Sequence, residues 1–156
     1  QKAYATAHGE ANVYTPQVIV NGLAGAAGGD QAEIAQAIKT AKGVDGALSV
    51  AMRLSETGGH FSVEVAGGSG GPAGVFALRV ARASTVQILR GENAGRSVTY
   101  TNVVRAIDKL GDWTGKTATF VMPGAARDGE GFVVLVQKGT PERPGAILAA
   151  AKSEGL

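Results

Sequence analysis

The sequence predicts an α+β protein in which a short helix, a strand hairpin and a second helix precede an antiparallel β-sandwich. Apolar residues make up 44% of the 156 residues, but aromatic residues make up only 5%. The 24 glycines suit short strands joined by many turns. The apolar pattern changes from a helical period to a period of two near residues 43–46. We therefore divide the chain into a first unit at residues 1–45 and a β-sandwich domain at residues 46–156.

The first unit begins with a helix expected at residues 2–8. Residues 13–20 follow as a strand, with a proline near its start, where a missing N–H is tolerated. Asn21-Gly22 predicts a tight hairpin turn, because such a turn requires positive φ angles. Residues 23–27 then form a second, weaker strand.

The clearest helix of the sequence begins after Asp30, which can cap its N-terminus. Glu33 stands three residues later, as in a capping box, and Gly43 is the expected stop. The residues of one helix face are apolar: Ile34, Ala37, Ile38 and Ala41. This pattern predicts a helix that packs on the preceding hairpin.

The second unit begins with two alternating segments, residues 48–55 and 61–66, joined by Thr57-Gly58-Gly59. They predict a half-buried antiparallel hairpin. Further strands are expected at residues 75–82, 85–90, 97–107, 117–122 and 132–137, and residues 145–151 form a last strand or short helix. Several short strands at this spacing indicate a β-sandwich.

Composition excludes several classes of function. The 15 basic and 13 acidic residues are mixed along the chain, so the sequence lacks the run of basic residues that is typical of nucleic-acid binding. No stretch approaches the ~18 consecutive apolar residues of a transmembrane helix. The chain has no cysteine, so it can form no disulfide and no thiolate of its own. Its start at Gln1 fits a processed or truncated chain.

The sequence offers no catalytic constellation, so we expect a protein that is not an enzyme on its own. His8 and His60 lack the spacing of metal ligands. Ser69 lies in a flexible glycine-rich loop rather than in a nucleophile elbow. Asp128 and Glu130 form a pair of carboxylates, but a solvated turn explains them better. We therefore expect no cofactor and no metal.

Several segments together carry a resemblance to a known family. They are Val13–Gly22, Gly29-Asp30, Arg90–Arg96 with Thr101–Arg105, and Leu110–Gly115. The chain resembles secreted bacterial thioredoxin-like proteins of unknown function. The resemblance implies a partial thioredoxin-like ββα unit at residues 1–45, export to the periplasm and a cis bond before Pro16. Members of that family carry an earlier Cys-x-x-Cys half, and this sequence starts after it.

The first candidate contact surface lies at Thr15, Pro16, Val18 and Val20. In a complete thioredoxin fold, Thr15-Pro16 would present backbone to a substrate beside the cysteines. Without those cysteines, an inherited structural turn is the favoured explanation. The strand that follows would have one unpaired edge, because its neighbour from the first half is absent. We expect a protein partner, a second copy or the first helix to cover residues 13–20.

The second candidate surface is a polar, glycine-containing turn between two strands. Its candidate contact residues are Arg90, Glu92, Asn93, Arg96 and Arg105. They suit an anion or a partner carboxylate. The alternative is a long hairpin in which Asn93 and Gly95 make the turn and Glu92 pairs with an arginine. Trp113, the sole tryptophan, is expected to anchor a strand end or a partner.

These observations leave three hypotheses on function. The first is a non-catalytic accessory protein of the bacterial periplasm, a small subunit of a larger complex such as a membrane-bound oxidoreductase. The second is a fragment of a thioredoxin-like thiol–disulfide oxidoreductase whose cysteine-bearing half is missing. The third is a module that binds a small ligand or an anion through the region from Arg90 to Arg105.

Overall fold

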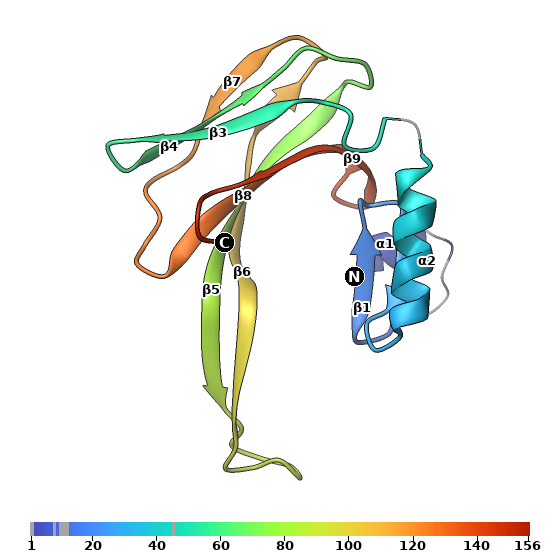
Figure 1. The fold of residues 1–156 in the computed structure, drawn as a ribbon, viewed down its shortest axis with the longest axis vertical. Coiled ribbons are helices and arrows are strands. Elements are labelled where there is room, and N and C mark those ends of the chain that lie inside the picture. The colour runs from blue at the N-terminus through green and yellow to red at the C-terminus, as the bar shows by residue number, and fades with distance from the viewer. Residues whose placement is uncertain (1, 8, 10–12, 45) are drawn as a thin grey trace.

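The computed structural model describes residues 2–7, 9, 13–44 and 46–156. It combines two helices with antiparallel sheets in this part of the chain, which confirms the predicted mixture of helix and antiparallel strand. The elements are α1 (Lys2–Ala7), β1 (Gln17–Val20), β2 (Ala24–Ala27), α2 (Gln31–Lys42), β3 (Met52–Thr57), β4 (His60–Val65), β5 (Ala73–Gln87), β6 (Ser97–Trp113), β7 (Ala118–Val121), β8 (Glu130–Thr140) and β9 (Arg143–Lys152). Figure 1 shows their arrangement.

Strands β1 and β2 form the predicted hairpin, although β1 is shorter than the segment expected at residues 13–20. Its turn has Asn21 and Gly22 at φ values of 51° and 72°, which is the backbone that the Asn-Gly pair favours. Leu23 N donates to Val20 O at 2.9 Å and closes the turn. The turn chemistry therefore sets the hairpin as predicted.

Helix α2 packs on this hairpin and begins at the predicted cap. Asp30 Oδ1 accepts from the backbone N–H groups of Ala32 and Glu33, at 2.8 and 3.0 Å. The expected capping box is wrong, because Glu33 Oε2 accepts from Ala27 N in β2 instead. Glu33 thus ties the helix to the hairpin rather than to its own cap.

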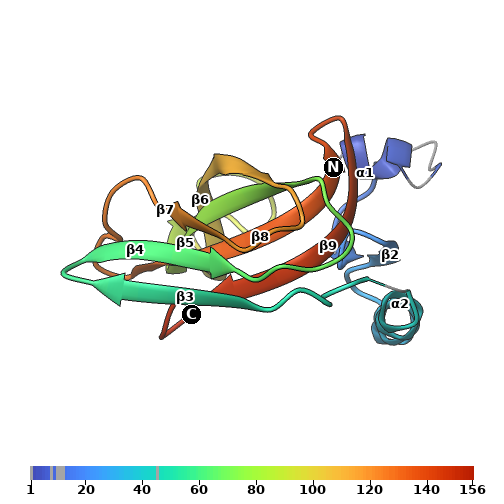
Figure 2. The same ribbon diagram turned by 90° about the horizontal axis from the view of Figure 1, so that it is seen from above.

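The sandwich consists of a three-stranded sheet, β3-β4-β7, and a four-stranded sheet, β6-β5-β8-β9. Figure 2 shows β3 and β4 as one layer beside β5, β8 and β9. Valines from both sheets lie between the layers and are fully buried: Val63, Val65, Val75, Val134 and Val136. The alternation in the sequence thus places one face of each sheet in a common core.

Two predicted strands, residues 75–82 and 85–90, fall mostly within one continuous strand, β5, which ends at Gln87. Its partner β6 is longer than predicted and has 17 residues. The segment at residues 145–151, for which the sequence allows either a strand or a short helix, lies within strand β9. The long β5–β6 ladder contains register irregularities at Val75/Phe76 and at Arg79/Val80.

Strand β9 also joins the first unit to the sandwich. Ile147 N donates to Asn21 O at 2.9 Å, and Ile147 O accepts from Leu48 N at 3.0 Å. A Cβ at Gly22 would lie 2.2 Å from Gly145 O, so only glycine permits this close approach. Helix α1 packs against β9. The cover expected over residues 13–20 stays a prediction.

Candidate functional site

The distal half of the β5–β6 hairpin projects beyond the sheet. Strand β8 pairs with β5 from Gly74 to Ala81, but the pairing of β5 with β6 continues to Gln87 and Ser97. We call residues 83–101 the arm. Figure 1 shows it extending away from both sheets. Along the arm, each strand has only the other strand as a ladder partner among the described residues.

The arm begins at a local break in the ladder. Arg82 N donates to Gly129 O, in the loop before β8, at 3.0 Å. Opposite it, Asn102 adopts φ 53°, a left-handed conformation that asparagine tolerates better than most residues. Pairing resumes with Ala83 and Thr101. Beyond this junction, the arm extends away from both sheets (Figure 1).

Backbone hydrogen bonds define the tip of the arm. Ile88 N donates to Arg96 O and Gly95 N donates to Ile88 O, both at 2.8 Å. Gly91 and Gly95 have φ values of 86° and 84°, so these glycines supply the left-handed positions. Asn93 lies in the turn between them, and its backbone carbonyl accepts a bond from Arg96 N at 3.2 Å.

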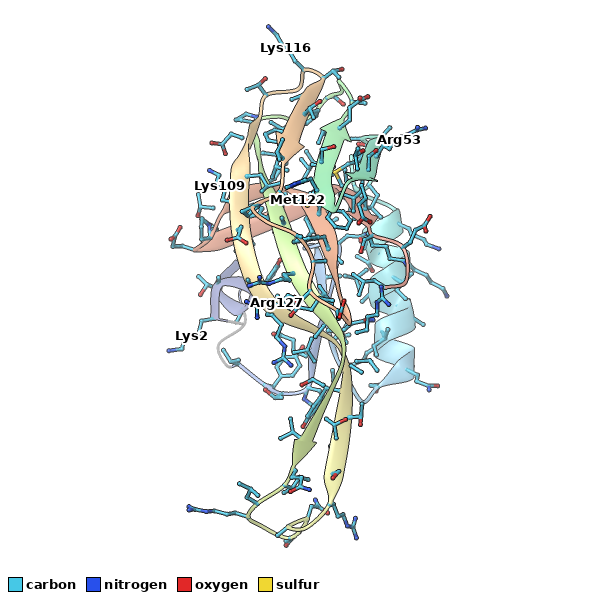
Figure 3. All side chains as sticks on the ribbon, turned by 90° about the vertical axis from the view of Figure 1, so that its left-hand side faces the viewer. Lys2, Arg53, Lys109, Lys116, Met122 and Arg127 are labelled. Atoms are coloured by element: carbon cyan, nitrogen blue, oxygen red, sulfur yellow. The ribbon has the colours of Figure 1, made fainter. Side chains whose placement is uncertain are left out.

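The side chains of the arm have no tertiary cover in the described structure. Leu89 at the tip is 83% exposed, Tyr100 is 55% exposed and Val86 is 49% exposed. Thr85 and Thr99 hydrogen-bond across the strands at 2.8 Å. Figure 3 shows side chains leaving the arm on both sides with no other element beside them. A two-stranded ribbon of this kind is only marginally stable in water, so a contacting surface would stabilise it.

The charged residues of the arm do not form one anion site. No ion pair joins Glu92 to Arg90 or Arg96 within the described residues, so the expected Glu92–arginine pair is wrong. Arg105 lies near the base, where its Nη2 donates to Ser84 Oγ at 2.7 Å. Arg105 follows Arg96 by nine positions, which corresponds to roughly 30 Å of strand. The predicted residues therefore divide into a tip and a base.

Thr15 and Pro16 are exposed at the entry to β1, and the bond between them is cis, as the resemblance implied. Gly28 faces Pro16 across the hairpin, and Gly28 N donates to Pro16 O at 2.8 Å. A Cβ at Gly28 would lie 2.9 Å from Pro16 Cβ. The pair Pro16 and Gly28 thus packs closely and presents Thr15-Pro16 at the surface.

Strand β1 has one edge that no other strand pairs in the described part of the chain. In an antiparallel ladder, hydrogen-bonded residue pairs alternate with pairs that are not hydrogen-bonded to each other. Gly28 N donates to Pro16 O, so the pair Ile19 and Gly25, three positions along, is of the second kind, and the backbone groups of Ile19 point away from β2. Val18 and Val20 are half-buried. The same unit also exposes apolar side chains on α2 and just after it, since Ile38 and Val44 are each 39% exposed.

Trp113 lies at the end of β6 and is fully buried, so its side chain is not available to a partner. It lies close to Gly68, which belongs to the glycine-rich loop before β5. Burial at the end of β6 fits the expected strand-end anchor, and it leaves no exposed surface of this side chain for a partner. The sequence showed an aromatic residue at a turn but not the loop that covers it.

Glu130 is more buried than the solvated turn that the sequence predicts for it. It begins β8, and its side chain is only 15% exposed, so the expected solvated turn is wrong for this carboxylate. The nearest cation is Arg79, whose Nε lies 3.7 Å from Glu130 Oε2. His60 is exposed at the start of β4, and His8 lies outside the described residues. Among the described residues, no three potential ligand side chains form a metal-binding group.

Residues 1–137 match the model of a family described as "Protein of unknown function (DUF1223)". The chain belongs to this family. The chain is also similar to an X-ray crystal structure of a protein from Agrobacterium tumefaciens, with 27% sequence identity and a TM-score of 0.84. That similarity covers 100% of this chain and 68% of the other. No curated protein matches the chain. Membership in a family of unknown function is thus confirmed, and its thioredoxin-like character stays a prediction.

Neither described helix of this family member is long and apolar enough to cross a membrane.

Proposed function

We propose that the chain is a non-catalytic interaction protein of the bacterial periplasm, a small subunit of a larger complex such as a membrane-bound oxidoreductase. The arm at residues 83–101 is the observation that carries this proposal. It exposes apolar side chains on a ribbon that contributes nothing to the core. Large exposed apolar residues on a projecting element are typical of interaction sites.

The chemistry of the arm suits a protein surface with both apolar and acidic character. Leu89 offers an apolar anchor that is 83% exposed, and Arg90 and Arg96 flank it with positive charge. Arginine is enriched among the interface residues that contribute most to binding. The edge of β1 offers a second contact, by backbone pairing with a partner or a second copy.

Capture from the periplasmic extract of the source bacterium tests the proposal. The immobilised chain should retain a specific partner, and Leu89→Ser should reduce its recovery at least about tenfold, the loss expected for a hot-spot residue. Val121→Ser is the matched control, because Val121 is 69% exposed on β7, outside the arm. Equal recovery by both variants and the unmodified chain would contradict the role of the arm.

The location of the protein has its own test. Release of the natural protein by osmotic shock, together with periplasmic markers, is the expected result. Retention with cytoplasmic markers would contradict the periplasmic part of the proposal.

A thioredoxin-like oxidoreductase is the second candidate, and the arrangement of the first unit favours it. Thr15-Pro16, the β1–β2 hairpin and α2 packed upon it have the order of the second half of a thioredoxin fold. The similar Agrobacterium tumefaciens chain is longer, since the match covers 68% of it. Under this proposal, a cysteine pair from a preceding segment or another chain lies beside Thr15-Pro16, and β1 pairs with a strand of that segment.

An assay of thiol–disulfide exchange distinguishes this candidate function from the first. The chain as given should turn over no disulfide substrate, because it holds no cysteine. The natural gene product should catalyse exchange only if it carries a Cys-x-x-Cys pair. A natural product without cysteine that still captures a partner through the arm supports the non-catalytic role.

A further inference from the structure

The outer face of the four-stranded sheet carries an apolar patch. Side chains alternate along a strand between the two faces of a sheet. Because Ala77 and Val134 belong to the core between the sheets, their neighbours point to the outer face. Three of these neighbours are apolar and only half-buried: Phe76, Leu78 and Leu135. Phe76 and Leu135 are partners in the β5–β8 ladder, so they lie side by side.

A cavity of about 360 Å³ lies over this patch, and we call it the outer pocket. The three side chains of the patch line it, together with Ile107 of the adjacent strand β6. Ala3 and Tyr4 of α1 also line it, as does the turn between β8 and β9. Figure 2 shows α1 beside that turn. The volume is near the lower end of the range of ~300–1,000 Å³ that small-molecule sites occupy, so the pocket suits a small ligand.

The apolar side chains of the outer pocket remain open to solvent. Ile107 pairs with Leu78 in the β5–β6 ladder and is 64% exposed. A ligand on these side chains removes apolar surface from water, which favours binding. Phe76 and Tyr4 are both aromatic, and aromatic rings attract one another beyond the effect of the buried area. These features favour an aromatic ligand.

One side chain of the lining offers a hydrogen-bond acceptor with a fixed orientation. Gln137 Nε2 donates to Tyr4 Oη at 2.8 Å and to Gly145 O at 2.9 Å. These bonds use both N–H groups of the amide, so Oε1 is the acceptor that remains. Gln137 Oε1 has no donor among the described residues, yet it is not among the buried polar atoms that lack a partner. It is therefore open to the N–H or O–H group of a ligand.

Lys138 is the one charged residue among the described residues that line the outer pocket, and its head group is directed elsewhere. Its Cε lies 3.5 Å from the Cβ that Gly70 would carry, and Leu148 Cδ1 lies 3.4 Å from the same point. Leu148 is buried between the sheets, so the Lys138 side chain follows the core side of the sheet. Lys109 of β6 does not line the pocket, and its Nζ lies 2.7 Å from Asp112 Oδ1. An ion in the pocket would therefore lose hydration without gaining a counter-charge.

We propose that the outer pocket binds a small uncharged aromatic molecule with one hydroxyl or N–H group, such as a phenol. The hydroxyl group donates to Gln137 Oε1, and the ring packs on Phe76 and Ile107. The pocket shares no residue with the arm or with β1. The proposal therefore does not depend on the role of either surface in binding a partner.

Four probes of nearly equal size test the proposal by NMR titration of the isotope-labelled chain. 4-Methylphenol should bind saturably and shift the signals of Phe76, Leu78 and Ile107. 4-Fluorotoluene, which lacks the donor, should bind at the same place about two- to tenfold more weakly, the factor expected for one neutral hydrogen bond. Benzoate and benzylamine, which are charged, should bind at least about tenfold more weakly than 4-methylphenol.

Several results of the titration would overturn the proposal. They are binding of a charged probe or of 4-fluorotoluene as tightly as 4-methylphenol, signal shifts confined to other residues, and no saturable binding of 4-methylphenol.

Gln137→Met keeps the length of the side chain and removes the acceptor. The preference for 4-methylphenol over 4-fluorotoluene should then disappear. Tyr4→Phe is the matched control, because it breaks the same bond between Gln137 and Tyr4 but keeps Gln137 Oε1. The preference should persist in this variant. Its loss in Tyr4→Phe, or its persistence in Gln137→Met, would overturn the proposal.

Ile107→Ser tests the apolar lining at an exposed position. It should weaken 4-methylphenol binding at least about threefold, because it removes apolar contact with the ring. Val121→Ser is the matched control, since Val121 is 69% exposed on β7 in the other sheet and does not line the pocket. Equal affinity of Ile107→Ser and Val121→Ser would overturn the proposal. If Gln137→Met does not fold, this pair and the four probes decide the question.

Discussion

The two halves of the β5–β6 hairpin share one ladder but have opposite environments. In the half that belongs to the sandwich, which we call the body half, β5 pairs with β6 on one side and β8 on the other. Val75 and Ala77 in this half are 0% and 1% exposed. In the arm, β5 pairs with β6 alone, and Val86 is 49% exposed. Continuous hydrogen bonding therefore does not imply uniform stability, because tertiary packing supports only one half.

The largest expected effect comes from a truncation in the body half. Val75→Ala removes two buried methyl groups and leaves a cavity between the sheets, so unfolding free energy should fall by about 2–3 kcal/mol. Chemical denaturation, followed through Trp113 fluorescence, measures this change. A loss below about 0.5 kcal/mol, the range of an ordinary surface change, would show that the two sheets do not pack through Val75.

A substitution at the junction between the two halves should have an intermediate effect on the free energy of unfolding. Asn102→Val places a β-branched residue at a left-handed φ of 53°, which should cost about 1–2 kcal/mol. Asn102→Gly is the control, since glycine adopts this conformation without strain. Equal stability of the two variants would mean that the backbone at the junction relaxes to another conformation.

Arm variants should have the smallest effect on stability. Val86→Ala repeats the body substitution in the same strand, yet unfolding free energy should change by less than about 0.5 kcal/mol. Arg96→Ala should likewise leave the melting temperature nearly unchanged while it weakens partner capture. A large drop in the melting temperature of either variant would show that the arm packs against the chain in solution.

The same contrast explains what the sequence could predict. Local chemistry was sufficient for the hairpin turn at Asn21-Gly22, for the Asp30 cap and for the alternation in β3 and β4. Sequence alone did not predict that β5 continues through Ala83 and Ser84, because only β6 supplies the partner that keeps these residues extended. Pairing across many residues determines such strand lengths, and a local pattern does not contain it.

The candidate sites show the same limit. The sequence located the tip of the arm through its glycines and arginines, but it could not show that Arg96 and Arg105 lie far apart along the strand. It also assigned Trp113 to a possible surface, since the covering loop at Gly68 comes from 45 residues earlier. Burial of Glu130 likewise depends on Arg79 in a neighbouring strand.

Hydrogen exchange of backbone amides tests the contrast between body and arm most directly. Ile88 N and Ser153 N each donate a backbone hydrogen bond of 2.8 Å, to Arg96 O in the arm and to Phe132 O in the body. In the free chain, the Ile88 amide should exchange at least about a hundredfold faster, because local opening of the arm disrupts no core. Protection of Ile88 should rise when the captured partner is added. Equally slow exchange of both amides in the free chain, with no change on addition of the partner, would contradict the arm as an interaction surface.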